Sequence, residues 1–100
     1  MSYNLLAESE GELDWESLRS RILPELNWVE VFPIPKSGAG STDSVGLSIP
    51  AKAASEASYR EACRVAQILR QEFGMKVFEL HTSSELTPAT EERFRRSFLG

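Results

Sequence analysis

Hydrophobic positions recur along this chain with two periods, which predict strands and helices in turn. In residues 44–49 (SVGLSI), apolar side chains alternate with small or polar ones, the two-residue period of a strand. Residues 27–34 (NWVEVFPI) and 75–82 (MKVFELHT) are rich in β-branched and aromatic residues and are also predicted to be strands. Residues 3–7 (YNLLA) form a fourth, shorter strand candidate.

Helical spacing is found first in two short segments. Asp14 suits the N-cap of a first helix. That helix should end just before Pro24, because the residue preceding a proline avoids helical geometry. A last helix is predicted to begin at Thr87, since threonine caps well and the proline after it suits the first helical position.

The longest helical pattern lies between Ser55 and Gly74. Either Ser55 or Ser58 is expected to cap this helix, and Ser58 with Glu61 fits a capping box. Gly74 should end it, because the residue after a helix often adopts a left-handed conformation that favours glycine. The predicted apolar face consists of residues three and four apart: Tyr59, Ala62, Cys63, Ala66, Leu69 and Phe73.

The order of these elements, β-α-β-β-α-β-α, predicts the fold class. It is typical of an α+β protein, and more finely of a ferredoxin-like split βαβ sandwich (βαββαβ) with an extra C-terminal helix. The sheet is expected to be antiparallel, with the two main helices on one face. One hundred residues suffice for one hydrophobic core, so residues 1–100 are expected to form a single small domain. The residues expected in that core are Leu18, Ile22, Val29, Val31, Val45, Leu47, Ile49, Ala66, Leu69, Phe73, Phe78 and Leu80.

The composition narrows the compartment and the chemistry. Hydrophobic residues make up 41% of the sequence and aromatic residues 9%, as in globular domains. No apolar run approaches the roughly 18 residues of a membrane span, and residues 1–30 lack the basic start and apolar block of a secretion leader. A lone Cys63 and a single His81 argue against a disulfide and a metal site. We therefore expect a cytoplasmic protein with no cofactor and no membrane contact.

Acidic residues are concentrated near the N-terminus. The net charge is −4, but residues 1–50 hold eight acidic and three basic residues, whereas residues 51–100 hold seven acidic and eight basic ones. Because nucleic-acid affinity comes largely from neutralised phosphates, an acidic chain disfavours DNA or RNA as a partner. Favourable charge at a helix N-terminus explains only the end of the acidic run, and its start falls in a segment predicted to be irregular. The run comprises Glu8, Glu10, Glu12, Asp14 and Glu16.

Residues 36–43 have the composition of a phosphate-binding loop, with two glycines and hydroxyl side chains after Lys36. Such a loop carries its lysine after the second glycine and leads into a helix. Here Lys36 precedes both glycines, and a strand pattern follows. We therefore expect a long hairpin connection without an anion site.

Glu79 and His81 are the pair of side chains best suited to acid–base chemistry or to metal binding. Two residues apart on a strand, they should point to the same face. Without a further partner, we favour an exposed polar strand end with no chemical role. The alternative is a small dimeric ferredoxin-like enzyme or ligand-binding protein that uses this face. Cys63, on the apolar helix face, is expected to be an inert thiol.

The second predicted strand (NWVEVFPI) carries apolar side chains on both of its faces. Its valines point one way, whereas Trp28, Glu30 and Phe32 point the other way. One face should pack on the helices, so the other needs a different cover. The last helix, through Phe94 and Phe98, is the cover that we expect; a second copy of the chain or a partner protein are the alternatives.

These patterns favour a small, acidic, non-catalytic protein that acts by binding another protein. The concrete case is an inhibitor such as a toxin-neutralising immunity protein, because an acidic surface speeds association with a basic toxin or nuclease. A homodimer is the other arrangement that exposed aromatic side chains suggest. The residues expected to bind the partner are Glu8, Glu10, Glu12, Asp14, Glu16, Trp28, Glu30 and Phe32.

Overall fold

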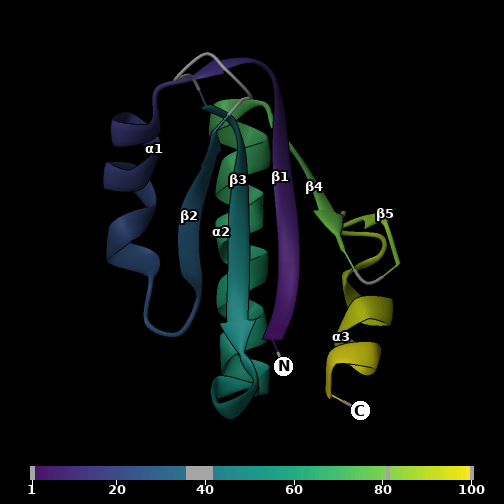
Figure 1. Ribbon diagram of the computed structural model, residues 1–100. Coiled ribbons are helices and arrows are strands. Elements are labelled where there is room, and N and C mark those ends of the chain that lie inside the picture. Colours follow the sequence, from purple (N-terminus) through teal and green to yellow (C-terminus); the bar gives the residue numbers. More distant parts are fainter. Residues whose placement is uncertain (1, 36–41, 81, 100) are drawn as a thin grey trace.

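A five-stranded antiparallel sheet with three α-helices forms the structure, a computed structural model that describes residues 2–35, 42–80 and 82–99 (Figure 1). The strands are β1 (Ser2–Leu13), β2 (Glu30–Pro35), β3 (Thr42–Pro50), β4 (Lys76–Glu79) and β5 (Ser84–Glu85). The helices are α1 (Trp15–Ile22), α2 (Glu56–Phe73) and α3 (Glu91–Leu99), with short 3-10 turns at Leu23–Glu25 and Ala51–Ala53. The predicted α+β class with an antiparallel sheet is therefore confirmed.

The strands lie in the order β2-β3-β1-β4-β5, and each neighbouring pair is antiparallel. It follows that β1 and β2 run parallel on either side of β3, joined through α1. In the same way β3 and β4 run parallel on either side of β1, joined through α2. Both connections return over the same face, where α1 contacts α2 and α2 runs along the sheet (Figure 1).

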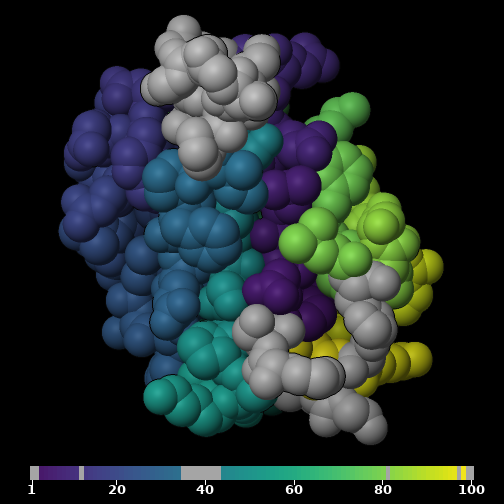
Figure 2. Space-filling view, viewed as in Figure 1, coloured from purple at the N-terminus to yellow at the C-terminus, as the bar shows by residue number. Residues whose placement is uncertain are grey.

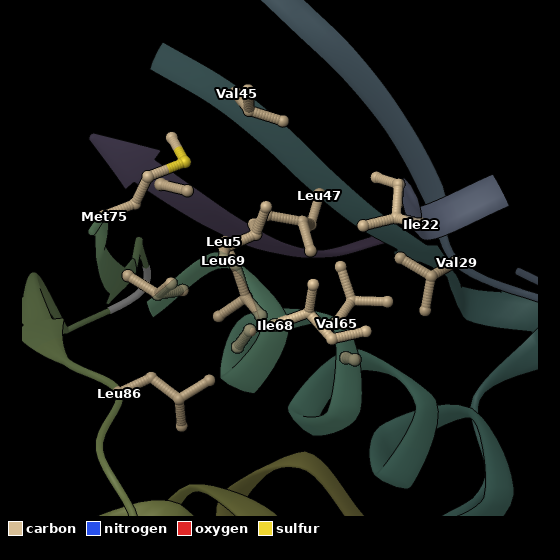
Figure 3. Packing of buried hydrophobic residues seen from close by; sticks show 14 of the residues in the cluster. Leu5, Ile22, Val29, Val45, Leu47, Val65, Ile68, Leu69, Met75 and Leu86 are labelled. Atoms are coloured by element: carbon tan, nitrogen blue, oxygen red, sulfur yellow. The ribbon is translucent and has the colours of Figure 1, made fainter. Parts of the chain in front are cut away.

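The hydrophobic core fills the space between α2 and the sheet. Alternate residues of the central strands point into it, among them Leu5 of β1 and Leu47 of β3, and they meet Val65 and Ile68 of α2 (Figure 3). The predicted apolar face of α2 is confirmed at Tyr59, Ala62, Ala66 and Leu69, which are buried. It omitted Val65 and Ile68, and it included Cys63 and Phe73, which are only half-buried. Packing of α1 on one flank of α2 and of α3 on the other buries more of its circumference than one stripe.

The ends of the two main helices are set by local hydrogen bonds. The Asp14 carboxylate caps α1 by accepting from the Ser17 backbone N–H (3.3 Å) and the Ser17 hydroxyl (2.7 Å), as predicted. Ser55 caps α2, and its capping box is completed by Ser58 rather than by Glu61. Gly74 follows α2 with φ +64°, the left-handed conformation that glycine adopts without strain.

The predicted strands differ from their expected limits: β3 is longer, β4 ends at Glu79 instead of Thr82, and β1 and β2 differ as follows. β1 continues from Ser2 to Leu13, so Glu8, Glu10 and Glu12 lie in a strand and not in an irregular segment. β1 pairs with β3 from Ser2 to Glu8 and again at Leu13, with a register irregularity between these two residues. At Glu8, pairing outweighs the weak strand preference of glutamate. β2 is shorter than predicted, because Asn27 and Trp28 form bends before it.

The register of β4 reverses the expected core positions. Val77 and Glu79 face the core and are fully buried, whereas Phe78 and Leu80 point to the other face, with Leu80 50% exposed. Pairing with β1 fixes this register, because the core residue Leu5 lies opposite Glu79. The placement of Phe78 and Leu80 in the core was therefore wrong.

α3 begins later than predicted and packs in an unexpected place. Thr87 to Thr90 form a turn in which the Thr87 backbone N–H donates to the Thr90 hydroxyl (2.8 Å), and the helix starts at Glu91. Phe94 is buried, and the ring of Phe98 packs against those of Tyr3 and Tyr59, with centroid distances of 4.8 and 5.3 Å. Because Tyr3 points to the core side of the sheet and Tyr59 belongs to α2, α3 extends the helix layer. The predicted cover of the opposite face by α3 is wrong.

Candidate functional site

The face of the sheet opposite the helices is open. In Figure 2 the side chains of β2, β3, β1 and β4 lie side by side on this face, and no helix crosses in front of them. The register places one apolar row across its middle: Phe32 lies opposite Gly46, Gly46 opposite Leu6, and Leu6 opposite Phe78. We call this surface the open face and these four residues its central row.

Phe32 and Gly46 are matched to each other within that row. A Cβ atom built on Gly46 would collide with the ring of Phe32, so the ring covers the space that a side chain would need. Glycine normally weakens a strand, and a close approach of this kind is a usual reason for finding one there. Phe32 nevertheless keeps 45% of its surface exposed. Trp28, in the bend that precedes β2, has the same exposed fraction.

A buried carboxylate holds the bend that carries Trp28. The Oε2 atom of Glu61 in α2 accepts hydrogen bonds from three consecutive backbone N–H groups, those of Asn27 (2.9 Å), Trp28 (2.8 Å) and Val29 (2.7 Å). Burial opposes ionisation of Glu61, but these bonds outweigh it and hold the pKa of Glu61 below its ordinary value. The chain therefore enters β2 in a fixed conformation.

Charges are distributed unequally between the two sides of the molecule. Every arginine of the sequence lies in a helix, and several pair there with carboxylates, as Arg21 does with Glu72 (2.7 Å). On the open face, the rows that flank the central row contain exposed Glu8 and Glu30, with Lys76 opposite Glu8. The open face is thus an apolar row with a rim in which two glutamates outnumber one lysine.

The rest of the predicted acidic run is distributed away from this rim. Glu10 is exposed in the part of β1 where the register shifts, between Glu8 and Leu13, and Glu12 belongs to the same strand by its backbone. Asp14 is engaged as the α1 cap, where the Ser17 hydroxyl and backbone N–H lower the pKa of its carboxyl group. Glu16 is exposed in the first turn of α1, in the helix layer. The structure therefore brings Glu8, Glu30 and Phe32 onto one surface but does not gather the five acids.

The candidate catalytic residues do not form a site on the open face. Glu79 is fully buried on the core side, so the exposed polar strand end expected there is wrong, and His81 lies outside the described residues. Burial, with the negative charge of Glu91, raises the pKa of the Cys63 thiol to about 11, which keeps the thiol protonated near neutral pH. Residues 36–41, expected to form a hairpin connection, also lie outside the described residues.

The residues that the structure describes contain neither a candidate metal site nor a helix that could span a membrane. None of their histidine, cysteine, aspartate and glutamate side chains gather in groups of three that could hold a metal ion. None of their helices has the length and apolar character needed to cross a membrane.

Three residues of the open face were missed by sequence reasoning. Leu6, Gly46 and Phe78 belong to three different strands, and only the pairing of β1 with β3 and β4 aligns them. Gly46 carried a weak signal, because it is the one glycine inside a cleanly alternating strand pattern. Glu61 was also missed as a positioning residue, although a glutamate on the buried side of a helix requires hydrogen-bond partners.

No protein-family model matches the sequence, and neither curated proteins nor solved structures show significant similarity to it. Function therefore rests on the geometry of this molecule.

Proposed function

We propose that the protein is a small, non-catalytic binding module whose open face docks a basic partner protein. The observation that carries the proposal is the central row, with Phe32 packed over Gly46 and left 45% exposed although three helices are available to cover it. Apolar patches bordered by polar residues are typical of protein-binding surfaces, and aromatic side chains supply much of the energy of such interfaces.

Charge selects the kind of partner. The rim residues Glu8 and Glu30, and a net charge of −4, favour a surface rich in lysine and arginine. A second copy of the chain fits less well, because two such faces would bring their acidic rims together. The concrete case that we propose is an inhibitor, such as an immunity protein that neutralises a basic toxin or nuclease.

We also propose the finer fold assignment of a ferredoxin-like split βαβ sandwich, with β5 and α3 as additions. The order of the first four strands and the two parallel connections through α1 and α2 support it. This assignment carries no functional weight, since that fold hosts enzymes and binding proteins alike.

The partner can be identified through the central row itself. A photo-crosslinking amino acid placed at position 32 should capture a basic protein in cells, whereas the same group at Gln71, an exposed position on α2, should not. The captured protein, purified separately, should then bind the unmodified chain, and Phe32→Ala should weaken that binding by about 2 kcal/mol or more. Capture from both positions alike, or full binding by Phe32→Ala, would refute the proposal.

Gly46→Ala tests the same row without removing a side chain. The added methyl group must displace the Phe32 ring, and the exposed ring can move. We expect binding to weaken while the thermal stability changes less than binding does. An unchanged affinity would show that the position of the ring is irrelevant to docking.

The rim predicts a salt-dependent association rate. Replacing Glu8 and Glu30 together by glutamine should slow association with the basic partner at low salt and have little effect at high salt. Glu16→Gln, an exposed glutamate in the helix layer, is the matched control and should leave the rate unchanged. Equal effects of the rim and control variants would indicate a general charge effect and no docking by this face.

A further inference from the structure

A hollow lies away from the open face, between the β4–β5 region and α3. It has a volume of about 350 Å³ and is lined by Glu79, Thr82, Ser84, Arg93 and Phe94. Pockets of this size hold small molecules. Its lining combines one buried acid, one arginine, two hydroxyl side chains and one aromatic ring.

Glu79 lines this cavity and has one hydrogen-bond acceptor without a partner. Its side chain is fully buried, and its Oε1 atom accepts from the Thr82 backbone N–H (2.8 Å). Its Oε2 atom is buried without a hydrogen-bond partner. Leaving such an oxygen unpaired costs free energy, and nearly all buried polar atoms have partners in folded proteins. The strongest missing partner for a carboxylate oxygen is a cationic N–H donor.

Arg93 contributes unused donors to the same cavity. Its guanidinium lies 5.0 Å from the centre of the Phe94 ring. Among the described residues it has no carboxylate partner, whereas Arg95 of the same helix pairs with Glu56 (2.7 Å). A planar guanidinium fixed against a ring presents a fork of donors that matches a carboxylate.

We infer that this cavity binds a small zwitterion, a free α-amino acid, with its ammonium group on Glu79 and its carboxylate on Arg93. The ammonium and carboxylate of such a ligand complement the unpartnered acceptor of Glu79 and the unpaired donors of Arg93, and the hydroxyl side chains of Thr82 and Ser84 are further partners for either group. Phe94 provides an apolar wall for the ligand's side chain. This binding site is separate from the open face, because Glu79 faces the core side of the sheet, and the inference goes beyond protein docking.

The test is a titration of the free amino acids into the isotopically labelled full chain, followed by two-dimensional NMR. We expect at least one amino acid to bind at millimolar concentration or below and to shift the backbone amide signals of Thr82 and Ser84. The corresponding amine without the carboxylate, and the acid without the ammonium, should each bind at least about tenfold more weakly. No shift with any amino acid, or equally strong binding of the amine alone, would overturn the inference.

Variants distinguish binding in this cavity from a general effect of surface charge. Arg93→Gln and Glu79→Gln should each weaken the amino acid by about ten- to a hundredfold, the usual result of losing one charge-assisted hydrogen bond. Arg96→Gln, an exposed arginine on the same helix, should bind like the parent. If Glu79→Gln does not fold, the exposed Arg93→Gln still decides the question. Parent-like binding by Arg93→Gln would overturn the inference.

Discussion

At the scale of single residues, Glu61 shows how one side chain can position a functional surface from behind. It belongs to the buried side of α2, yet its carboxylate ends among the backbone N–H groups of residues 27–29, which lead into β2. The three N–H groups stabilise the buried negative charge of Glu61. The carboxylate in turn accepts from the backbone donors of a bend that has no strand partner. Trp28 and Phe32 are therefore presented on a preformed edge, which lowers the entropic cost of docking a partner.

Glu61→Gln should destabilise the protein. The amide keeps the shape of the side chain but brings an N–H₂ group, or only a neutral oxygen, to the three donors. We expect a loss of about 2–3 kcal/mol in the free energy of unfolding, the scale of hydrogen bonds to a charged group. Urea unfolding measures this loss, and Glu16→Gln should melt like the parent. A loss no larger than that of Glu16→Gln would mean that the Glu61 cluster does not stabilise the fold.

The same residue predicts a dependence on pH. The pKa of Glu61 is lower in the folded than in the unfolded protein, so its contribution to stability is complete above its ordinary pKa of 4.5. That contribution is lost as the pH falls through the lowered folded-state pKa. The free energy of unfolding of the parent should therefore drop more steeply in acid than that of Glu61→Gln. Parallel curves for the two proteins would contradict the assignment.

At the scale of elements, the sequence predicts most of the order of strands and helices but not their register. The core-facing side of β3 was predictable, because the large apolar residues of 44–49 occupy every second position and therefore lie on one face. In β4 a glutamate alternates with valine, and the more apolar residues Phe78 and Leu80 are on the other side. Simple hydrophobicity selects the wrong face there. The buried acid is acceptable only because of contacts made by later residues, which no local pattern contains.

A matched pair of leucines tests these assignments. Leu69 of α2 has no exposed surface, so Leu69→Ala should cost about 2–5 kcal/mol of unfolding free energy. Leu80 is 50% exposed after β4, so Leu80→Ala should change stability by no more than about 0.5 kcal/mol. Denaturant melts of both variants give the comparison. A Leu80→Ala loss as large as that of Leu69→Ala would place Leu80 in the core after all.

At the scale of the whole molecule, the fold separates the arginines of the helix layer from the acidic rim of the open face. The strand pattern of residues 27–34 was enough to predict that Glu30 and Phe32 share the side of β2 that points away from the core, whereas Trp28 lies in the bend before the strand. It was not enough to find the central row, because that row joins residues from four strands distant in sequence. The acidic run, close together in sequence, is dispersed in space by the turn from β1 into α1.

This separation predicts the state of the isolated chain. Repulsion between acidic rims should keep the protein monomeric in sedimentation experiments at micromolar concentration, despite the exposed central row. Replacing Glu8 and Glu30 by glutamine should raise any tendency to self-associate, because the apolar row then lacks its charged border. A parent dimer that Phe32→Ala converts to monomers would show instead that the open face serves a second copy of the chain.

The packing of Phe32 over Gly46 also constrains how this gene can diverge. A side chain at position 46 and a ring at position 32 compete for the same space, so a change at one position alters what selection tolerates at the other. In descendant sequences, glycine at 46 should persist where an aromatic residue persists at 32. Where position 32 becomes small, position 46 should be released to acquire the β-branched residues that strands favour. The two sites should therefore drift together, and their covariation would record the contact in lineages for which no structure exists.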